Sequence, residues 1–173
     1  DPRFLVVEDL FDPDRDVPPE QAEAVARVLG MPVDELRLQP VTIRLLLQPA
    51  HRGQAERYME AARAALRGYG LRLGAYPYET LTMVDPPRGG LGAGGMEYPT
   101  FITLGTHPLL EVPGFTRLRA PESVTVHEFG HNFFQGMIAS NEFEEAWIDE
   151  GMNSYYEAVV MDEHYGRMIE LFG

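Results

Sequence analysis

The sequence predicts an α+β fold, and three observations lead to this prediction. Short runs rich in β-branched residues stop at prolines, as at 41–47 and 81–84. Longer runs place apolar residues at three-and-four spacing, as at 54–67 and in the segment after Pro121. The chain has 173 residues, of which 45% are hydrophobic and 10% aromatic. This length and composition suit a globular domain with a sizeable core.

Composition and charge exclude several classes of function. The chain has no cysteine, so histidines and carboxylates must supply the ligands of any metal site. A net charge of −13 opposes binding to nucleic acid or anionic lipid and mildly favours cationic ligands such as peptide amino termini. No apolar stretch is long enough for a membrane span. The sequence does not indicate in which cellular compartment the protein lies. Because the chain begins with Asp, we expect it to be part of a longer polypeptide.

The first forty residues predict a strand, a connection, a helix and a link. Phe4–Val7 is apolar and suits a strand, whereas the Asp- and Pro-rich stretch Phe11–Pro19 suggests an irregular surface connection. The acid-first, alanine-rich pattern of Glu20–Leu29 predicts a short helix, and 31–40 is a link. We assign no function to residues 1–40.

The central part predicts a strand, a helix and a further strand. Val41–Leu47 is β-rich, and Leu81–Val84 is a second strand. The helix between them is predicted over Gln54–Arg67, with Gly68 and Gly70 beyond its end. Both strands and the helix are typical of a scaffold.

A glycine-rich stretch at 89–98 leads into the strand-like segment 100–104. Its spacing matches neither a phosphate-binding loop nor a dinucleotide-binding fingerprint. It suits either a flexible loop or the close approach of backbone to an extended ligand. Residues 106–120 then read as a connection.

The most informative stretch is the H-E-x-x-H motif formed by His127, Glu128 and His131. On a helix, residues four apart lie about one turn apart, so both imidazoles can reach a single ion. Glu128 lies close enough to take a proton from water. Five letters can match by chance, but Pro121 suits a first helical turn. Apolar residues at helical spacing predict the buried side of this helix, namely Val126, Phe129, Phe133 and Met137.

A second helix is predicted from Asn141 towards Met161, and it carries Glu150 nineteen positions after His131. That distance lets one helix end and a second pack antiparallel, which returns a carboxylate to the two imidazoles. Alternatively, the acidic residues of this segment form a solvated face. The spacing favours a third metal ligand.

Three motifs together resemble the gluzincin aminopeptidases, the aminopeptidase N-like zinc family with a thermolysin-like catalytic domain. The H-E-x-x-H motif and its distant Glu come first. W-I-D-E-G at 147–151 and S-Y-Y-E at 154–157 are similar to the family's W-L-N-E-G and S-Y-x-E. G-G-M-E-Y at 94–98 is similar to G-x-M-E-N. The resemblance covers about residues 41 to 165.

The resemblance implies a thermolysin-like lobe: a small, mostly antiparallel mixed sheet with the motif helix and a following ligand helix. Residues 41–173 would form part of a zinc-metallopeptidase catalytic domain. His127, His131 and Glu150 would bind one Zn²⁺ ion, and Glu128 would act as the general base.

The resemblance also implies the remaining site residues. Gly94 and Gly95 would contact the substrate through their backbone, and Glu97 would bind the free α-amino group of a peptide. Glu145 and Glu157 would each orient a ligand histidine. Three family positions differ here, namely Tyr98, Asn132 and Asp149.

The leading hypothesis is therefore zinc-dependent release of amino-terminal residues from peptides with a free amino terminus. An endopeptidase or another hydrolase on the same scaffold is the alternative, and a non-catalytic zinc-binding domain is a third. We expect the family's transition-state tyrosine beyond Gly173, so that this part alone lacks full activity. The late tyrosines are interpreted as packing residues, namely Tyr155, Tyr156 and Tyr165.

Overall fold

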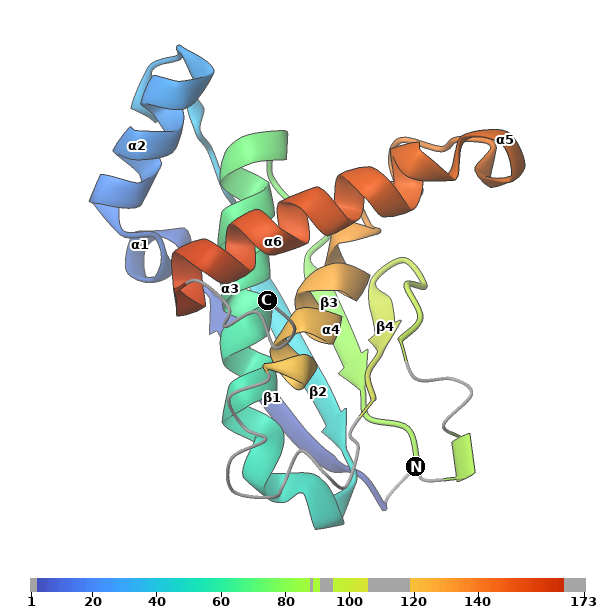
Figure 1. Cartoon of the computed structure of the whole chain (residues 1–173). Helices are drawn as coiled ribbons and strands as arrows, with labels where there is room; N and C mark the ends of the chain where they lie inside the picture. Colours follow the sequence, from blue (N-terminus) through green and yellow to red (C-terminus); the bar gives the residue numbers. More distant parts are fainter. Residues whose placement is uncertain (1–2, 88, 91–94, 106–118, 167–173) are drawn as a thin grey trace.

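The computed structural model describes residues 3–87, 89–90, 95–105 and 119–166. Their centre is a four-stranded sheet with the order β1-β2-β3-β4 (Figure 1). The strands are β1 Leu5–Phe11, β2 Val41–Leu47, β3 Thr80–Val84 and β4 Phe101–Thr103. The predicted α+β class agrees with this mixed sheet and its helices.

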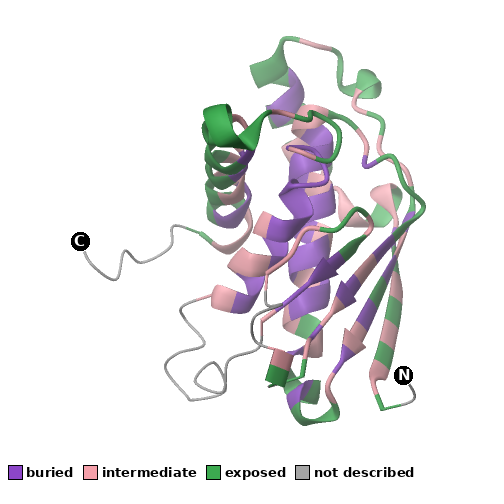
Figure 2. Cartoon of the chain, turned by 90° about the vertical axis from the view of Figure 1, so that its right-hand side faces the viewer, coloured by how far each residue is buried: buried purple, intermediate pink, exposed green. Residues whose placement is uncertain are grey.

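The molecule is built in layers, which Figure 2 shows edge-on. Helices α3, Ala55–Leu73, and α4, Ala120–Gly130, lie on one face of the sheet. Helix α6, Met152–Tyr165, packs on the outer side of α3 and α4. Alternate residues of β2 are fully buried against the helices, as the period of two in a strand requires. The core therefore lies between the sheet and α3 and α4.

The strand directions correct one prediction. Strands β1 and β2 are antiparallel, but β2 with β3 and β3 with β4 are parallel. The sheet is mixed, as expected, yet the prediction that it is mostly antiparallel is wrong. Helix α3 accounts for the parallel pair of β2 and β3, because a helix that crosses one face of a sheet joins two strands that run in the same direction.

The amino-terminal elements largely follow the sequence pattern. The predicted strand is present as β1, and the predicted helix as α2, Pro19–Leu29, which ends at Gly30 with a left-handed φ of 68°. The predicted irregular connection instead contains a helical turn, α1, Pro13–Asp16, which the Asp12 side chain caps by accepting from the Asp14 N–H. A 3₁₀ turn, Val33–Glu35, lies in the predicted link.

Helix α3 is longer than predicted, because it continues through Gly68 and Gly70. A Cβ at Gly68 would lie 2.5 Å from Val160 Cγ2, and one at Gly70 would lie 2.8 Å from Leu38 Cδ2. These glycines do not end the helix. They allow other parts of the chain to pack closely against it.

Helix α4 is shorter than predicted, because it ends at Gly130. Pro121 lies in its first turn, as expected. The chain then tightens into turns, with Gln135 at a φ of 74°. Phe133 is still buried, whereas Met137 is 43% exposed and does not belong to the buried side. The prediction is therefore right for Val126, Phe129 and Phe133 and wrong for Met137.

The predicted second helix consists of three parts. They are α5 Glu142–Ala146, a π-helical turn at Trp147–Gly151 and α6 Met152–Tyr165. The backbone of Glu145 is not helical, with φ −135° and ψ 46°. The part of this segment that carries Glu150 is therefore wider than an ordinary α-helix.

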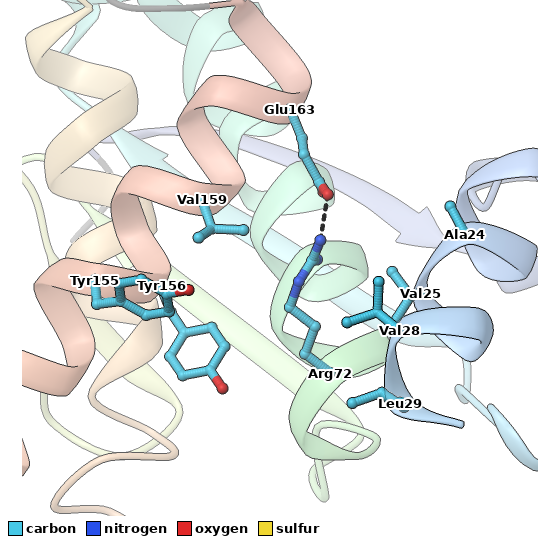
Figure 3. A pocket seen from close by; sticks show the side chains of 9 residues that line it. All are labelled: Ala24, Val25, Val28, Leu29, Arg72, Tyr155, Tyr156, Val159 and Glu163. Carbon is cyan, nitrogen blue, oxygen red and sulfur yellow. Dashed lines mark hydrogen bonds and ion pairs between the residues drawn. The ribbon is translucent and has the colours of Figure 1, made fainter. Parts of the chain in front are cut away.

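Helices α2 and α6 flank a cavity of about 220 Å³, and Figure 3 shows the side chains that line it. An ion pair between Arg72 of α3 and Glu163 of α6 crosses it. Apolar side chains of both helices line the rest, among them Val28 and Val159. None of the described helices is long and apolar enough to cross a membrane.

Candidate metal centre

The two motif histidines lie side by side at the end of α4. Their Nε2 atoms are 3.2 Å apart, and their rings are nearly perpendicular, at 83°. Two nitrogen ligands of one tetrahedral zinc ion are expected about 3.3 Å apart, given Zn–N distances near 2.0–2.1 Å. The helical spacing of His127 and His131 therefore produces a pair of donors suited to a single ion.

Glu150 supplies a third donor from the π-helical turn. Its Oε2 atom lies 3.4 Å from His127 Nε2 and 3.7 Å from His131 Nε2. One ligand atom of each of the three residues lies within 4.8 Å of the others. The structure thus brings together all three predicted ligands. The Glu150 side chain is 62% exposed, so this side of the cluster faces solvent.

Each imidazole contacts a carboxylate through its other ring nitrogen. His127 Nδ1 lies 3.0 Å from Glu157 Oε2, and His131 Nδ1 lies 2.6 Å from Asp149 Oδ1. With Nδ1 donating in both neutral rings, each Nε2 atom keeps a lone pair that is free to bind a cation. Two lone pairs 3.2 Å apart repel each other unless a cation lies between them. The donor set therefore fits a zinc ion.

The hydrogen bond that His127 donates to Glu157 also raises the pKa of His127 above its usual value, although burial opposes this shift. A proton can therefore take the place of a cation when no metal is bound. Ser123, one turn earlier on α4, donates to the other oxygen of Glu157. Glu157 is thus held between its histidine and a hydroxyl group.

The structure distinguishes between the two glutamates expected to orient the histidines. Glu157 lies against His127, as described above. The Glu145 side chain is exposed, and it has no hydrogen bond or ion pair with any other described residue. Asp149, which is 6% exposed, occupies the corresponding position beside His131. The sequence offered one signal for this residue, an acid directly before the third ligand.

Glu128 is close to the histidines but differs from them in its environment. Its side chain is 8% exposed, and burial raises its pKa to about 7. His127 and His131 act in the opposite direction, while the negative charges of Glu97 and Glu150 add to the increase. Glu128 therefore exchanges protons near neutral pH in the metal-free protein.

Gly95 lies directly against Glu128. A Cβ at this position would be 2.8 Å from Glu128 Oε1, and the φ of Gly95 is 72°. Both observations explain why a glycine occupies this position. The backbone of the glycine-rich stretch thus approaches the carboxylate closely. Gly94, the other predicted backbone contact, lies outside the described residues.

Glu97 lies beside the histidine pair. It is half-buried and shares with His131 a cavity of about 230 Å³. The other lining residues are Tyr98, Pro99, Gln135 and Gly136. Met96 pairs with Thr103, and the Thr100 N–H donates to Asn132 Oδ1 at 3.2 Å, so β4 and the end of α4 hold this segment from both sides.

The late tyrosines differ in their surroundings. Tyr156 stacks on Phe134 with ring centroids 5.6 Å apart, and Arg119 lies over the ring of Tyr165. Both are packing residues, as expected. Tyr155 contacts the edge of Tyr156 but is 62% exposed, so its contribution to packing is small.

Two imidazoles and a carboxylate that could hold one metal ion, with a buried glutamate of raised pKa beside them, form the kind of donor set found in metal-dependent hydrolases. A comparison with protein families agrees with this class. Residues 59–172 match the peptidase family M1 domain, which is well over half of the chain. The chain therefore belongs to peptidase family M1, and the predicted aminopeptidase N-like gluzincin family is confirmed. A comparison with curated proteins finds no match.

Membership of this family supports metallopeptidase activity, and family M1 peptidases are zinc-dependent. The matched residues begin within α3 and include every residue of the candidate metal centre. Strands β1 and β2 and helix α2 lie before the matched part.

Proposed function

We propose that the chain forms the zinc-binding part of an aminopeptidase, which releases residues from the amino terminus of peptides. One observation carries this proposal: ligand atoms of His127, His131 and Glu150 lie within 4.8 Å of one another, with Glu128 buried beside them. A purely structural zinc site has no need for the fourth residue, Glu128, and usually has four protein ligands.

The roles of the residues follow from their contacts. His127, His131 and Glu150 would hold the zinc ion, and Glu157 and Asp149 fix the orientation of the imidazoles. When bound, the ion would supply a Lewis acid that polarises the scissile carbonyl and lowers the pKa of a water molecule.

Glu128 would act as general base and then as general acid. Its carboxylate accepts a proton from the attacking water and delivers it to the nitrogen of the leaving amine. A carboxyl group can do both efficiently when its pKa lies near the working pH, and burial brings Glu128 to about 7 in the metal-free protein. Its burial beside Gly95 limits the access of bulk water to this proton.

Glu97 would bind the free α-amino group of the substrate. This carboxylate is half-buried, lies in the cavity next to His131 and interacts electrostatically with Glu128. A partly buried carboxylate favours an ammonium partner, which an internal peptide bond does not offer. The net charge of −13 attracts the same cationic end.

The first test is the metal content of the purified chain after dialysis against zinc. A stoichiometry near one ion per chain is expected, and it should fall in His127→Ala. The Glu144→Gln variant, which removes an exposed carboxylate, serves as the control. A wild-type chain that retains no zinc would refute the proposal.

The second test compares a peptide with a free amino terminus and the same peptide acetylated, in the full-length protein. Glu128→Gln should abolish turnover and retain zinc. Glu97→Gln should raise KM for the free peptide and leave zinc in place. Equal cleavage of both peptides by the wild type would indicate an endopeptidase. The absence of turnover in a zinc-loaded wild type would indicate a non-catalytic domain.

A further inference from the structure

Three helices meet directly beneath the metal motif at three residues. Tyr69 comes from α3, Gly130 from α4 and Asn153 from α6. The side chains of Tyr69 and Asn153 are both fully buried. A buried amide and a buried hydroxyl are retained in a core only when their polar groups are paired.

The pairing runs from α3 through α6 to α4. The Tyr69 hydroxyl donates to Asn153 Oδ1 at 2.9 Å, and Asn153 Nδ2 donates to the backbone carbonyl of His127 at 2.8 Å. That carbonyl belongs to the first motif histidine. It also accepts a long bond of 3.4 Å from the His131 N–H at the end of α4. Asn153 thus fastens the last helical turn of the motif to α6.

Gly130 leaves room for this arrangement. A Cβ at Gly130 would lie 1.9 Å from Asn153 Oδ1 and 2.3 Å from the Tyr69 hydroxyl. Contacts this short do not occur, so any side chain at this position would displace the amide or the ring. The second variable position of the H-E-x-x-H motif is therefore fixed by α3 and α6 and not by the metal.

Asn153 lies on α6 close to the residues that contact the motif histidines, so its hydrogen bond to His127 affects their position. Asn153 follows Glu150 by three residues and precedes Glu157 by four, so Asn153 lies within about one helical turn of each of them. Glu150 reaches both histidines and Glu157 contacts His127 Nδ1. Along the sequence, Asn153 thus lies between Glu150 and Glu157, and all three residues contact His127.

We propose that Tyr69, Gly130 and Asn153 form a clamp that sets the position of α6 on α4, and that Asn153 is a positioning residue for the metal ligands. This inference rests on the proposed zinc site. The clamp places Glu150 at the distance from the two Nε2 atoms at which all three can share one ion. A buried pair that served only the stability of the core would have no such effect on metal binding.

Zinc affinity, measured by competition with a chelator, distinguishes the two roles. Asn153→Ala should weaken zinc binding about 10–100-fold, as is typical when a residue behind a metal ligand is lost. Tyr69→Phe removes only the hydroxyl and should weaken binding less, in the same direction. The control is Ile43→Ala in β2, which opens the core without touching the clamp and should leave the affinity of the folded protein unchanged.

A second readout follows the geometry of the site. In the cobalt-substituted protein, Asn153→Ala should change the visible absorption bands, which report the coordination geometry. Ile43→Ala should keep the wild-type spectrum. If Asn153→Ala keeps both the wild-type affinity and the wild-type spectrum, the clamp is refuted while the zinc site stands. A wild-type chain without zinc affinity would refute both.

Gly130→Ala tests the third member of the clamp. Its methyl group would overlap both the Asn153 amide and the Tyr69 hydroxyl, so the folded variant should bind zinc at least as weakly as Asn153→Ala. A folded Gly130→Ala variant with the zinc affinity of the wild type would overturn the clamp.

Discussion

Replacing Glu128 by Gln should change how the stability of the metal-free protein depends on pH. Burial raises the pKa of this carboxyl from 4.5 to about 7, so the folded protein holds a proton that the unfolded chain releases. This contribution to stability is complete below about pH 4.5, and it is lost as the pH rises through 7. Gln keeps the shape of the protonated side chain and does not titrate.

The magnitude follows from the shift in pKa. One pKa unit corresponds to about 1.4 kcal/mol, so a shift from 4.5 to about 7 corresponds to about 3 kcal/mol. The group is 8% exposed, so solvent screening reduces this value little. Between pH 4 and pH 8, the free energy of unfolding of the wild type should fall by about 3 kcal/mol relative to Glu128→Gln.

Urea unfolding in the presence of a chelator measures this difference directly. Both proteins are followed from pH 4 to pH 8, and the other titrating groups cancel when the two curves are subtracted. Glu144→Gln, which changes an exposed carboxylate, should run parallel to the wild type. Parallel curves for the wild type and Glu128→Gln would show that burial of Glu128 does not raise its pKa. Saturating zinc should reduce the difference, because a nearby cation favours the carboxylate.

Three further predictions concern zinc and packing. Asp149→Ala should weaken zinc binding about 10–100-fold, whereas Glu145→Gln should not; equal chelator competition curves would contradict the contact with His131. Gly68→Ala should lower the free energy of unfolding in urea by about 1–3 kcal/mol, because its Cβ would lie 2.5 Å from Val160 Cγ2; an unchanged midpoint would contradict this. Zinc at a hundred times its Kd should stabilise the fold by about 2.7 kcal/mol, seen as a rise in Tm that a chelator reverses.

The metal cluster could be predicted from the sequence because its determinants are local or set by spacing. His127 and His131 share a helical face through a period that any α-helix has. Glu150 could be inferred because nineteen positions suffice for a turn between two helices, and the structure places it at the histidine pair. Strand β2 could be predicted for the same reason, because its β-branched residues and the proline after it are local signals in the sequence.

Other features depend on residues far away in the sequence. Gly68 and Gly70 look like a helix end, yet Val160 and Leu38 pack against them and the helix continues. Neither contact has a local signal. The parallel direction of β3 likewise depends on the helix that crosses the sheet, and the β-branched residues of the strand do not determine it.

Asp149 contacts His131 in place of the predicted Glu145, and this error of prediction has a different cause. The resemblance places Glu145 behind a ligand, and the sequence separately predicts one helix from Asn141 towards Met161. The backbone is not helical at Glu145, and a π-helical turn follows, so the segment is not one regular helix. No residue pattern in the sequence predicted either feature. Predictions of residues behind the ligands are therefore less secure than predictions of the ligands themselves.

The π-helical turn at Trp147–Gly151 also makes the length of this segment part of the metal site. In a regular α-helix, consecutive side chains point about 100° apart, yet Asp149 and Glu150 both reach the histidine pair. Deleting Gly151, which lies between Glu150 and α6, would rotate Glu150 by about 100° relative to α6 and Glu157, and so away from the histidine pair. The number of residues in this turn, as much as their identity, decides which carboxylate lies beside the two histidines.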